Sequence, residues 1–147
     1  PARPMWLGGV EFSEDRPGLK GHSDADVLIH AIVDALLGAA GLGDIGLHFP
    51  DTDQKWKDAS STHFLKTTSE LLSARGWLII NIDATLVAER PRIMRRHDEI
   101  RQVLANAAGV TADRVGVKAT TNETLGAIGR GEGAAALAVA TLARARH

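Results

Sequence analysis

Apolar residues recur at helical spacing in three stretches of the chain. The first predicted helix begins near Ser23 or Asp24, both suitable N-cap residues, and runs through Leu36 to the glycines of GLGDIG. The second, SSTHFLKTTSELLSARG, starts with serines and has Gly76 just past its end, and the third, HDEIRQVLANAAG, stops at Gly109. The apolar face of the first helix is expected to contain Val27, Leu28, Ala31, Ala35 and Leu36.

Four other segments have features of strands. PMWLGGV (Pro4–Val10) predicts a short strand that ends in the polar turn SEDRPG, and RVGVKATT predicts another. The segment GEGAAALAVATLARARH is ambiguous, because its alanines favour a helix whereas Leu137, Val139 and Thr141 fit strand alternation. We therefore expect an α+β domain of about three helices and four strands. In WLIINIDATLVAE, alternation predicts one face with Leu78, Ile80, Ile82, Ala84 and Leu86, and the opposite face with Asn81, Asp83 and Thr85.

Composition and charge narrow the class of protein. The 147 residues are 44% hydrophobic and 24% charged, which predicts a single folded domain over residues 1–147. The net charge of -1 with neutral histidines gives no general attraction to nucleic acid or an anionic membrane, so neither is an expected partner. No apolar stretch approaches the roughly 20 residues that span a bilayer, and the first residues do not have the pattern of a signal peptide, so we expect a cytoplasmic protein. The chain has no cysteine, which excludes disulfides, a thiolate nucleophile and cysteine-ligated metal.

Histidines and aspartates gather at the start of the first predicted helix, in HSDADVLIH. Asp26, His30 and Asp34 are spaced four residues apart, so a helix places them on one face. His30 is a candidate metal ligand with a carboxylate one turn away, and His22 and Ser23 lie where helix N–H groups favour a phosphate. The aspartates can equally well complement the helix dipole while His30 is an ordinary core histidine.

A long predicted loop, residues 41–58, is rich in glycine and aspartate. Its GLGDIG and FPDTD segments contain Asp44, Asp51 and Asp53, which could bind sugar hydroxyls or a divalent cation that carries phosphate. Loops of this length are often functional. Aspartate and glycine are also common turn residues, so this signal alone is weak.

The segment KATTNETLGAIGRGEG (Lys118–Gly133) follows a predicted strand with two threonines, Glu123 and four glycines around Arg130. Hydroxyls and backbone amides beside glycines suit phosphate oxygens, and a cation between them and Glu123 would relieve repulsion. A glycine-rich turn capped by Glu123 explains the segment equally well. Together, the three segments favour a polyphosphate substrate.

Three segments of the chain, HSDADVLIHAIVDALLGAAGLGDIGLHFPDTD, AERPRIM and KATTNETLGAIGRGEG, resemble the 2-C-methyl-D-erythritol 2,4-cyclodiphosphate synthase family in order and spacing. The resemblance extends from about Pro4 to the end. It implies conversion of 4-diphosphocytidyl-2-C-methyl-D-erythritol 2-phosphate into the cyclic diphosphate and CMP in the non-mevalonate isoprenoid pathway. The resemblance therefore implies a metal-dependent phosphorus–oxygen lyase.

The resemblance also implies how the chain folds and assembles. It implies a four-stranded mixed sheet with about three helices on one face, and it makes Gly133–Ala145 a strand. It further implies a homotrimer with the sheets toward the three-fold axis and active sites at the subunit interfaces. The substrate that the resemblance implies is a small molecule linked to cytidine diphosphate.

The resemblance assigns a role to each matching residue. His22 and Thr121 would be catalytic, His30 would bind Zn²⁺ or a similar cation, and Glu123 would bind the Mg²⁺ or Mn²⁺ that bridges the substrate diphosphate. Residues 49–53 would form a mobile loop over the sugar, residues 88–94 the cytidine pocket, and Asp26 and Asp34 would support the site. The substrate-binding residues would be His22, Ser23, Asp44, Ile45, Gly46, Phe49, Pro50, Asp51, Thr52, Asp53, Ala88, Pro91, Arg92, Ile93, Met94, Thr120, Thr121, Asn122, Glu123 and Arg130.

Some positions depart from the family pattern. The family's zinc site also uses an Asp-x-His near the amino end, and Pro1 follows that point, so we expect those ligands and the first strand residues upstream. Arg92 replaces a common lysine, which keeps the charge and changes the reach. Ala127 and Leu137 replace a bulkier residue and an acid near the axial channel, which puts an isoprenoid ligand there in doubt.

Two other functions fit parts of the pattern. One is a non-catalytic trimeric module that binds a cytidine nucleotide and has lost its zinc site. The other is a metal-dependent phosphohydrolase, which would need a base to activate water, and no residue is an obvious base.

Overall fold

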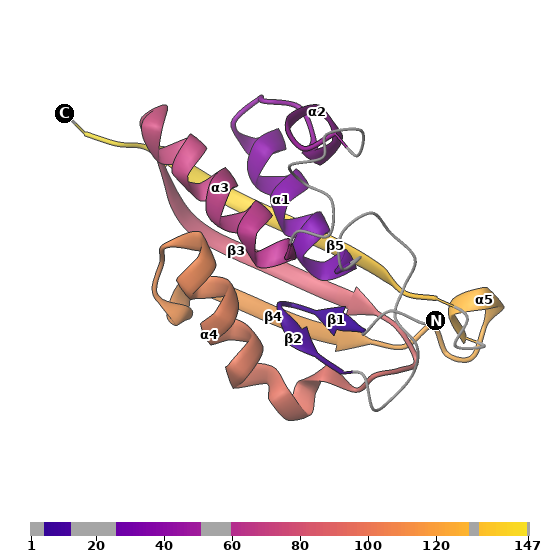
Figure 1. Ribbon diagram of the computed structural model, residues 1–147. Coiled ribbons are helices and arrows are strands. Elements are labelled where there is room, and N and C mark those ends of the chain that lie inside the picture. The colour runs from indigo at the N-terminus through magenta and orange to yellow at the C-terminus, as the bar shows by residue number, and fades with distance from the viewer. Residues whose placement is uncertain (1–4, 13–25, 51–59, 130–132, 147) are drawn as a thin grey trace.

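The computed structural model describes residues 5–12, 26–50, 60–129 and 133–146 (Figure 1). Its centre is a mixed sheet with the strand order β4–β3–β5. The middle strand, β3 (Trp77–Val87), is parallel to β4 (Val115–Thr120) and antiparallel to β5 (Ala135–Arg144). The ten-residue pairing with β3 confirms that the alanine-rich final segment is a strand.

Three long helices cover one face of the sheet, as Figure 1 shows. They are α1 (Val27–Ala39), α3 (Ser61–Ala74) and α4 (His97–Ala108). The predicted stops at Gly76 and Gly109 are confirmed, because both glycines have the left-handed backbone, with φ of 82° and 71°, that ends a helix. Shorter helical turns in the connections are α2 (Ile45–His48), η2 (Ile93–Arg96), η3 (Ala112–Arg114) and α5 (Gly126–Gly129).

The first predicted strand is wrong, and it changes the strand count. Instead of one strand over Pro4–Val10, the described residues form a hairpin of β1 (Trp6–Leu7) and β2 (Val10–Glu11). Gly8 and Gly9 have φ of 62° and 78°, which turns the chain back tightly and ends the strand. Within the described residues, the central sheet therefore has three strands and not the expected four.

The hairpin is attached to the first helix by Asp26, whose exposed fraction is 0%. Its carboxylate accepts hydrogen bonds from the N–H groups of Gly8 (3.0 Å), Gly9 (2.7 Å) and Ile29 (3.0 Å). Asp26 is thus the N-cap of α1, which corrects the predicted start near Ser23 or Asp24; those two residues lie outside the described part. An acid expected to support a metal site serves here to join a hairpin to a helix.

The predicted faces of β3 hold only in its second half. Ile82, Ala84 and Leu86 are buried as expected, whereas Leu78 and Ile80 are 50% and 39% exposed. The cause is a register shift between Ile79 and Asn81, where an extra residue in β3 reverses the alternation. Upstream of this bulge, the buried residue is Ile79.

The buried face of α1 is also shifted from the prediction. Val27, Ala31 and Ala35 lie at its half-buried margin. The helix packs against β3, β5 and α3 together, so its buried face is wide. None of the described helices is both long and apolar enough to cross a membrane. The fully buried residues of α1 are Leu28, Ile29, Ile32, Val33, Leu36 and Leu37.

Candidate active site

Two predicted binding segments meet at the ends of the parallel strands β3 and β4. Val87 pairs with Thr120 at the end of the ladder, and the N–H of Ala88 donates to the Thr120 carbonyl at 3.0 Å. The hydrogen-bonded ladder thus continues one residue beyond β3. It places the start of the predicted cytidine segment, residues 88–94, beside the predicted diphosphate loop, residues 120–123.

The loop after β4 is held in an unusual backbone conformation. Glu123 and Thr124 have φ of 51° and 63°, a left-handed region that is unfavourable for residues with side chains. The Glu123 N–H donates to Thr121 Oγ1 at 3.2 Å, and the Thr124 N–H donates to Glu89 Oε1 at 3.1 Å. Such strain is often found at functional sites, where surrounding contacts maintain it. Here the contact to Glu89 connects the loop to the cytidine segment.

A close backbone contact closes the same loop. A Cβ atom added at Gly129 would lie 2.1 Å from the Thr124 carbonyl carbon, so only glycine fits there. The Asn122 side chain donates from Nδ2 to the Leu125 carbonyl at 2.7 Å. Residues 120–123 are exposed at this rim, so the Thr120 and Thr121 hydroxyls and the Glu123 carboxylate are open to a ligand.

The cytidine segment is anchored by its own side chains. Ile93 is completely buried, and Ala88 is 8% exposed. Pro91 is also buried, whereas Arg92 and Met94 are exposed. Because Ala88, Pro91 and Ile93 are buried, a ligand over this segment would meet backbone groups and the side chains of Arg92 and Met94.

His30 lies on α1 beside two phenylalanines. Its ring centroid is 6.1 Å from that of Phe64, which in turn is 5.0 Å from that of Phe49. Its Nε2 atom is 3.4 Å from Ser61 Oγ, and Ser61 is completely buried. The half-buried histidine is therefore in contact with the start of α3, and Phe64 connects it to Phe49, the residue that follows α2.

Two aspartates hold the segment that was predicted to bind the sugar. Asp44 caps α2 by accepting the Leu47 N–H at 3.0 Å, and Asp34 on α1 accepts the Ile45 N–H at 2.7 Å. Asp34 therefore connects the helix that carries His30 to the Asp44–Gly46 segment. A role of Asp34 in supporting a binding site stays a prediction.

The structure thus arranges the predicted residues in two groups. One group surrounds His30, α2 and Phe49, and the other surrounds the carboxyl ends of β3 and β4. Figure 1 shows α2 well separated from α5, which follows the second group. The predicted residues His22, Ser23, Asp51, Thr52, Asp53 and Arg130 lie outside the described part.

The two metal predictions differ in how well the described residues fit them. Among these residues, no three His, Cys, Asp or Glu side chains gather as a metal site. A zinc ion takes three or four protein ligands, so His30 by itself does not make a zinc site. Magnesium needs only one or two carboxylates when substrate phosphates supply the rest, and exposed Glu123 fits that chemistry.

Three residues near the site were not singled out from the sequence. Glu89, whose carboxylate holds the Thr124 N–H, lies inside AERPRIM and could have been proposed from that segment. Ser61 and Phe64 reach His30 from a helix about thirty residues further along the chain. Nothing in the local pattern indicates this long-range contact.

Comparisons with known proteins identify the family that this chain resembles. The model of the YgbB family matches residues 1–143. The 2-C-methyl-D-erythritol 2,4-cyclodiphosphate synthase of Desulfatibacillum aliphaticivorans is 56% identical over 95% of this chain and 90% of its own. The bifunctional enzyme IspD/IspF of Anaeromyxobacter dehalogenans is 55% identical, and the match covers 99% of this chain and 37% of that protein. The chain therefore spans little more than a third of the bifunctional relatives' length.

Solved structures have the same fold. The bifunctional IspDF of Campylobacter jejuni superposes with a TM-score of 0.90 at 43% identity, over 97% of this chain and 38% of that one. The Plasmodium falciparum IspF in complex with CDP superposes with a TM-score of 0.86 at 29% identity, over 98% of this chain and 86% of that one.

Proposed function

Because the chain belongs to the YgbB family, we propose that it converts 4-diphosphocytidyl-2-C-methyl-D-erythritol 2-phosphate into 2-C-methyl-D-erythritol 2,4-cyclodiphosphate and CMP in the cytoplasm. The observation that carries the proposal is the hydrogen bond between Ala88 and Thr120. It joins a segment suited to a nucleobase to a loop suited to a diphosphate, and the substrate carries both groups on one ribose. The names of the relatives favour catalysis over a non-catalytic nucleotide-binding module.

In the proposed reaction, an oxygen of the 2-phosphate attacks the β-phosphorus. The bond from that phosphorus to the oxygen bridging to the α-phosphate breaks, and CMP leaves with the bridging oxygen and the electron pair. Two anionic groups must meet, so the protein has mainly to orient them and to offset their charge. Exposed hydroxyls of Thr120 and Thr121 would donate hydrogen bonds to phosphate oxygens, and residues 88–94 would hold the cytosine through backbone groups.

Metals are a separate part of the proposal. A magnesium ion held by Glu123 and by the substrate would neutralise diphosphate charge. Zinc at His30 requires further ligands beyond the described residues, and we assign no step to it. His22 and Ser23 are proposed to bind the 2-phosphate, and Arg130 to lie near the substrate.

We further propose that the active unit is a homotrimer. On the sheet face opposite the helices, Leu137 and Val139 of β5 are 67% and 69% exposed, where they pair with Thr85 and Asp83 of β3. Exposed apolar side chains of this size, next to each other on one strand face, are typical of a protein interface. Val139→Glu should give monomers by native mass spectrometry, whereas Gln102→Glu, the same charge change on the outer side of α4, should leave trimers. A monomeric parent protein would contradict the proposed homotrimer.

The activity is tested with the substrate, zinc and magnesium, and the products are identified by phosphorus NMR. Cyclic diphosphate with CMP is the expected result. Unchanged substrate would indicate a binding module, and an open-chain product would indicate hydrolysis; either would overturn the proposal. Thr121→Ala should reduce turnover by about 100-fold through loss of a hydrogen-bond donor. Thr67→Ala, on α3 and away from both groups of site residues, is the matched control and should not change it.

A further inference from the structure

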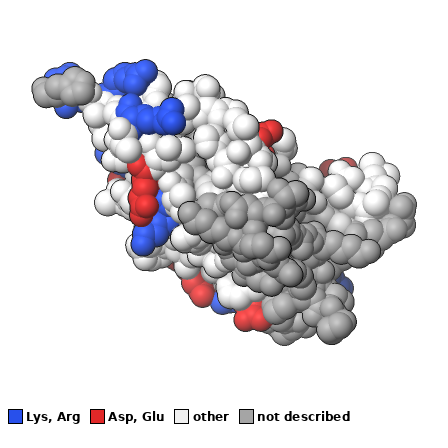
Figure 2. Space-filling model, turned by 45° about the horizontal axis from the view of Figure 1, so that its top comes forward, with Lys and Arg blue, Asp and Glu red and all other residues white. Residues whose placement is uncertain are grey.

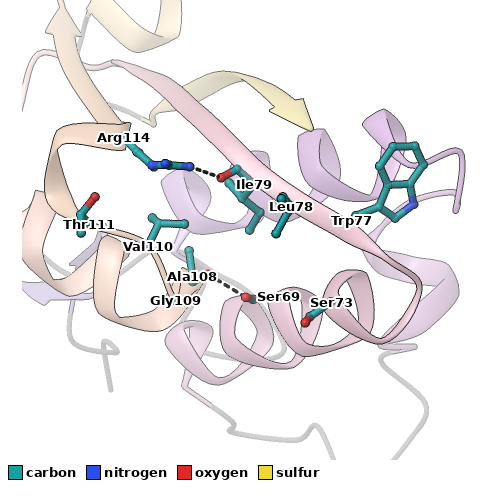
Figure 3. Close-up of a pocket in the computed structure, with 10 residues that line it drawn as sticks. All are labelled: Ser69, Ser73, Trp77, Leu78, Ile79, Ala108, Gly109, Val110, Thr111 and Arg114. Carbon is teal, nitrogen blue, oxygen red and sulfur yellow. Dashed lines mark hydrogen bonds between the residues drawn. The ribbon is translucent and has the colours of Figure 1, made fainter. Parts of the chain in front are cut away.

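A cavity of about 440 Å³ lies at the opposite end of β3 from the candidate active site (Figure 3). Its walls come from the start of β3, the last turns of α3 and α4, and the connection into β4. The length of β3, eleven residues, separates it from Ala88 by roughly 30 Å at the rise of a strand. It therefore belongs to neither group of candidate site residues.

Three carbonyl groups at the helix ends near the cavity already accept hydrogen bonds. Near the end of α4, the Ala108 carbonyl accepts the Ser69 hydroxyl at 2.6 Å, and the Ala105 carbonyl accepts the Val110 N–H at 3.0 Å. At the end of α3, the Ser73 carbonyl accepts the Gly76 N–H at 3.0 Å. These bonds satisfy acceptors at the helix ends, where a cation would otherwise be favoured.

Arg114 and Ser73 in the lining have hydrogen-bond donors without a partner among the described residues. Arg114 donates from Nη1 to the Ile79 carbonyl at 3.1 Å, and Figure 3 shows its side chain extended along the cavity toward that carbonyl. This is the single hydrogen bond of its guanidinium within the described part of the chain, which leaves most of its five N–H groups for a ligand. The Ser73 hydroxyl is likewise without a partner among the described residues. The bond to Ile79 fixes the guanidinium in place before any ligand binds.

Part of the cavity wall is apolar, and several arginines lie near it. Leu78, Ile79 and Val110 line the cavity beside Arg114. Arg144 lies over the Trp77 ring at 3.8 Å from its centroid and donates to the Arg75 carbonyl, so these arginines gather at the same end of the sheet. Figure 2 shows lysine and arginine side chains concentrated at the end of the molecule where the chain terminates. Their field would attract an anion.

We propose that this cavity binds a small organic anion, with its carboxylate or phosphate on Arg114 and its apolar body against Leu78, Ile79 and Val110. The volume suits a compact ligand, because small-molecule sites usually measure roughly 300–1,000 Å³. Arg114 supplies a paired-donor geometry that matches both anion types. The proposal does not depend on the reaction proposed above, since it concerns a different part of the fold.

Binding is tested by titrating the full chain with phenyl phosphate, benzoate and inorganic phosphate, and following backbone amide signals by NMR. Phenyl phosphate or benzoate should cause saturable shifts at Ile79, Val110 and Thr111, and the better of the two identifies the anion. Inorganic phosphate should bind about tenfold more weakly, because it has no apolar surface to bury. Equal binding of all three probes, or no saturation, would overturn the proposal.

Three variants distinguish specific binding in the cavity from general attraction of anions to a basic surface. Arg114→Gln should weaken phenyl phosphate binding at least about tenfold, the usual effect of losing a charged hydrogen bond. Ser73→Phe should also weaken it by filling the cavity without changing the charge. Arg146→Gln makes the same charge change at the same end of the sheet but outside the lining, and should leave affinity within about threefold. If Arg146→Gln weakens binding as much as Arg114→Gln, or Ser73→Phe has no effect, the assignment is wrong.

Discussion

The backbone N–H of Ala88 donates to the carbonyl of Thr120 at 3.0 Å, one residue beyond the last pair of the β3–β4 ladder. Parallel neighbouring strands end at the same edge of a sheet, and this bond holds together the two segments that follow β3 and β4. The candidate nucleotide site is therefore built on rigid backbone. The contacts that maintain this arrangement, and those in the second group of residues around His30, can each be tested by substitution.

Gly129→Ala should disrupt the loop that contains Thr121 and Glu123, because its Cβ would lie 2.1 Å from the Thr124 backbone. We expect a loss of kcat/KM of at least about tenfold, since misplacement of binding groups by about 1 Å is costly. Gly133→Ala is the control, because a Cβ there meets nothing within 4 Å. Steady-state kinetics check both. Equal activity of the two variants would contradict the loop geometry.

Glu89 should act as a positioning residue through the Thr124 N–H, which it accepts at 3.1 Å. Glu89→Ala removes the acceptor and should lower kcat/KM several-fold while leaving the unfolding temperature nearly unchanged, since the contact is exposed. Glu89→Gln retains a carbonyl oxygen at the same place and should restore most of the activity. A failure of glutamine to restore it would show that charge, and not loop position, is what Glu89 contributes.

Asp26→Ala should destabilise the protein by about 3 kcal/mol or more, because it removes the N-cap and leaves buried N–H groups without an acceptor. The three donors are the N–H groups of Gly8, Gly9 and Ile29. Urea denaturation measures the loss. Asp26→Asn keeps one carbonyl oxygen and should lose less, whereas Asp34→Asn, an exposed site in the same helix, should change stability by under about 1 kcal/mol. Similar values for Asp26→Ala and Asp34→Asn would be inconsistent with the described contacts.

Asp34→Ala should weaken substrate binding by freeing the Ile45 N–H, which Asp34 accepts at 2.7 Å. The proposed sugar contacts at Asp44–Gly46 would then be less well placed, so we expect KM to rise by roughly fivefold with a smaller change in kcat. Asp34→Asn still offers a carbonyl oxygen and should retain a nearly normal KM. If alanine and asparagine have the same effect, the hydrogen bond to Ile45 is not what matters.

The bidentate contact between Arg96 and Glu99, at 2.9 Å for both hydrogen bonds, lowers the pKa of Glu99 below its usual value of 4.5. The carboxylate is stabilised in the folded state, so its contribution to stability is present above pH 4.5 and is lost as the pH falls through the lowered pKa. The stability difference between the parent and Glu99→Gln should therefore narrow below pH 4.5. In Arg96→Met, an NMR titration should show the Glu99 pKa returning upward; an unchanged titration would contradict this cause.

Local order in the sequence predicted much of the fold. Helices α3 and α4, with their ends at Gly76 and Gly109, follow from periodic apolar residues and a left-handed stop, which are properties of neighbouring residues. The segments that could hold a diphosphorylated nucleotide were likewise visible as local combinations of threonine, glycine and acid. The chemistry of these segments follows from residue types that lie close together in the sequence.

Tertiary structure decided where those segments lie and which faces are buried. The bulge at Ile79–Asn81 reverses the alternation of β3, and pairing of β3 with Ala135–Arg144 makes an alanine-rich segment a strand. Asp26 caps α1 and holds the hairpin turn 17 and 18 residues away in sequence, and Phe64 reaches His30 from another helix. These outcomes depend on hydrogen bonds and packing between residues far apart in the chain. Local periodicity has no means of specifying such contacts, because it records only which neighbours are apolar.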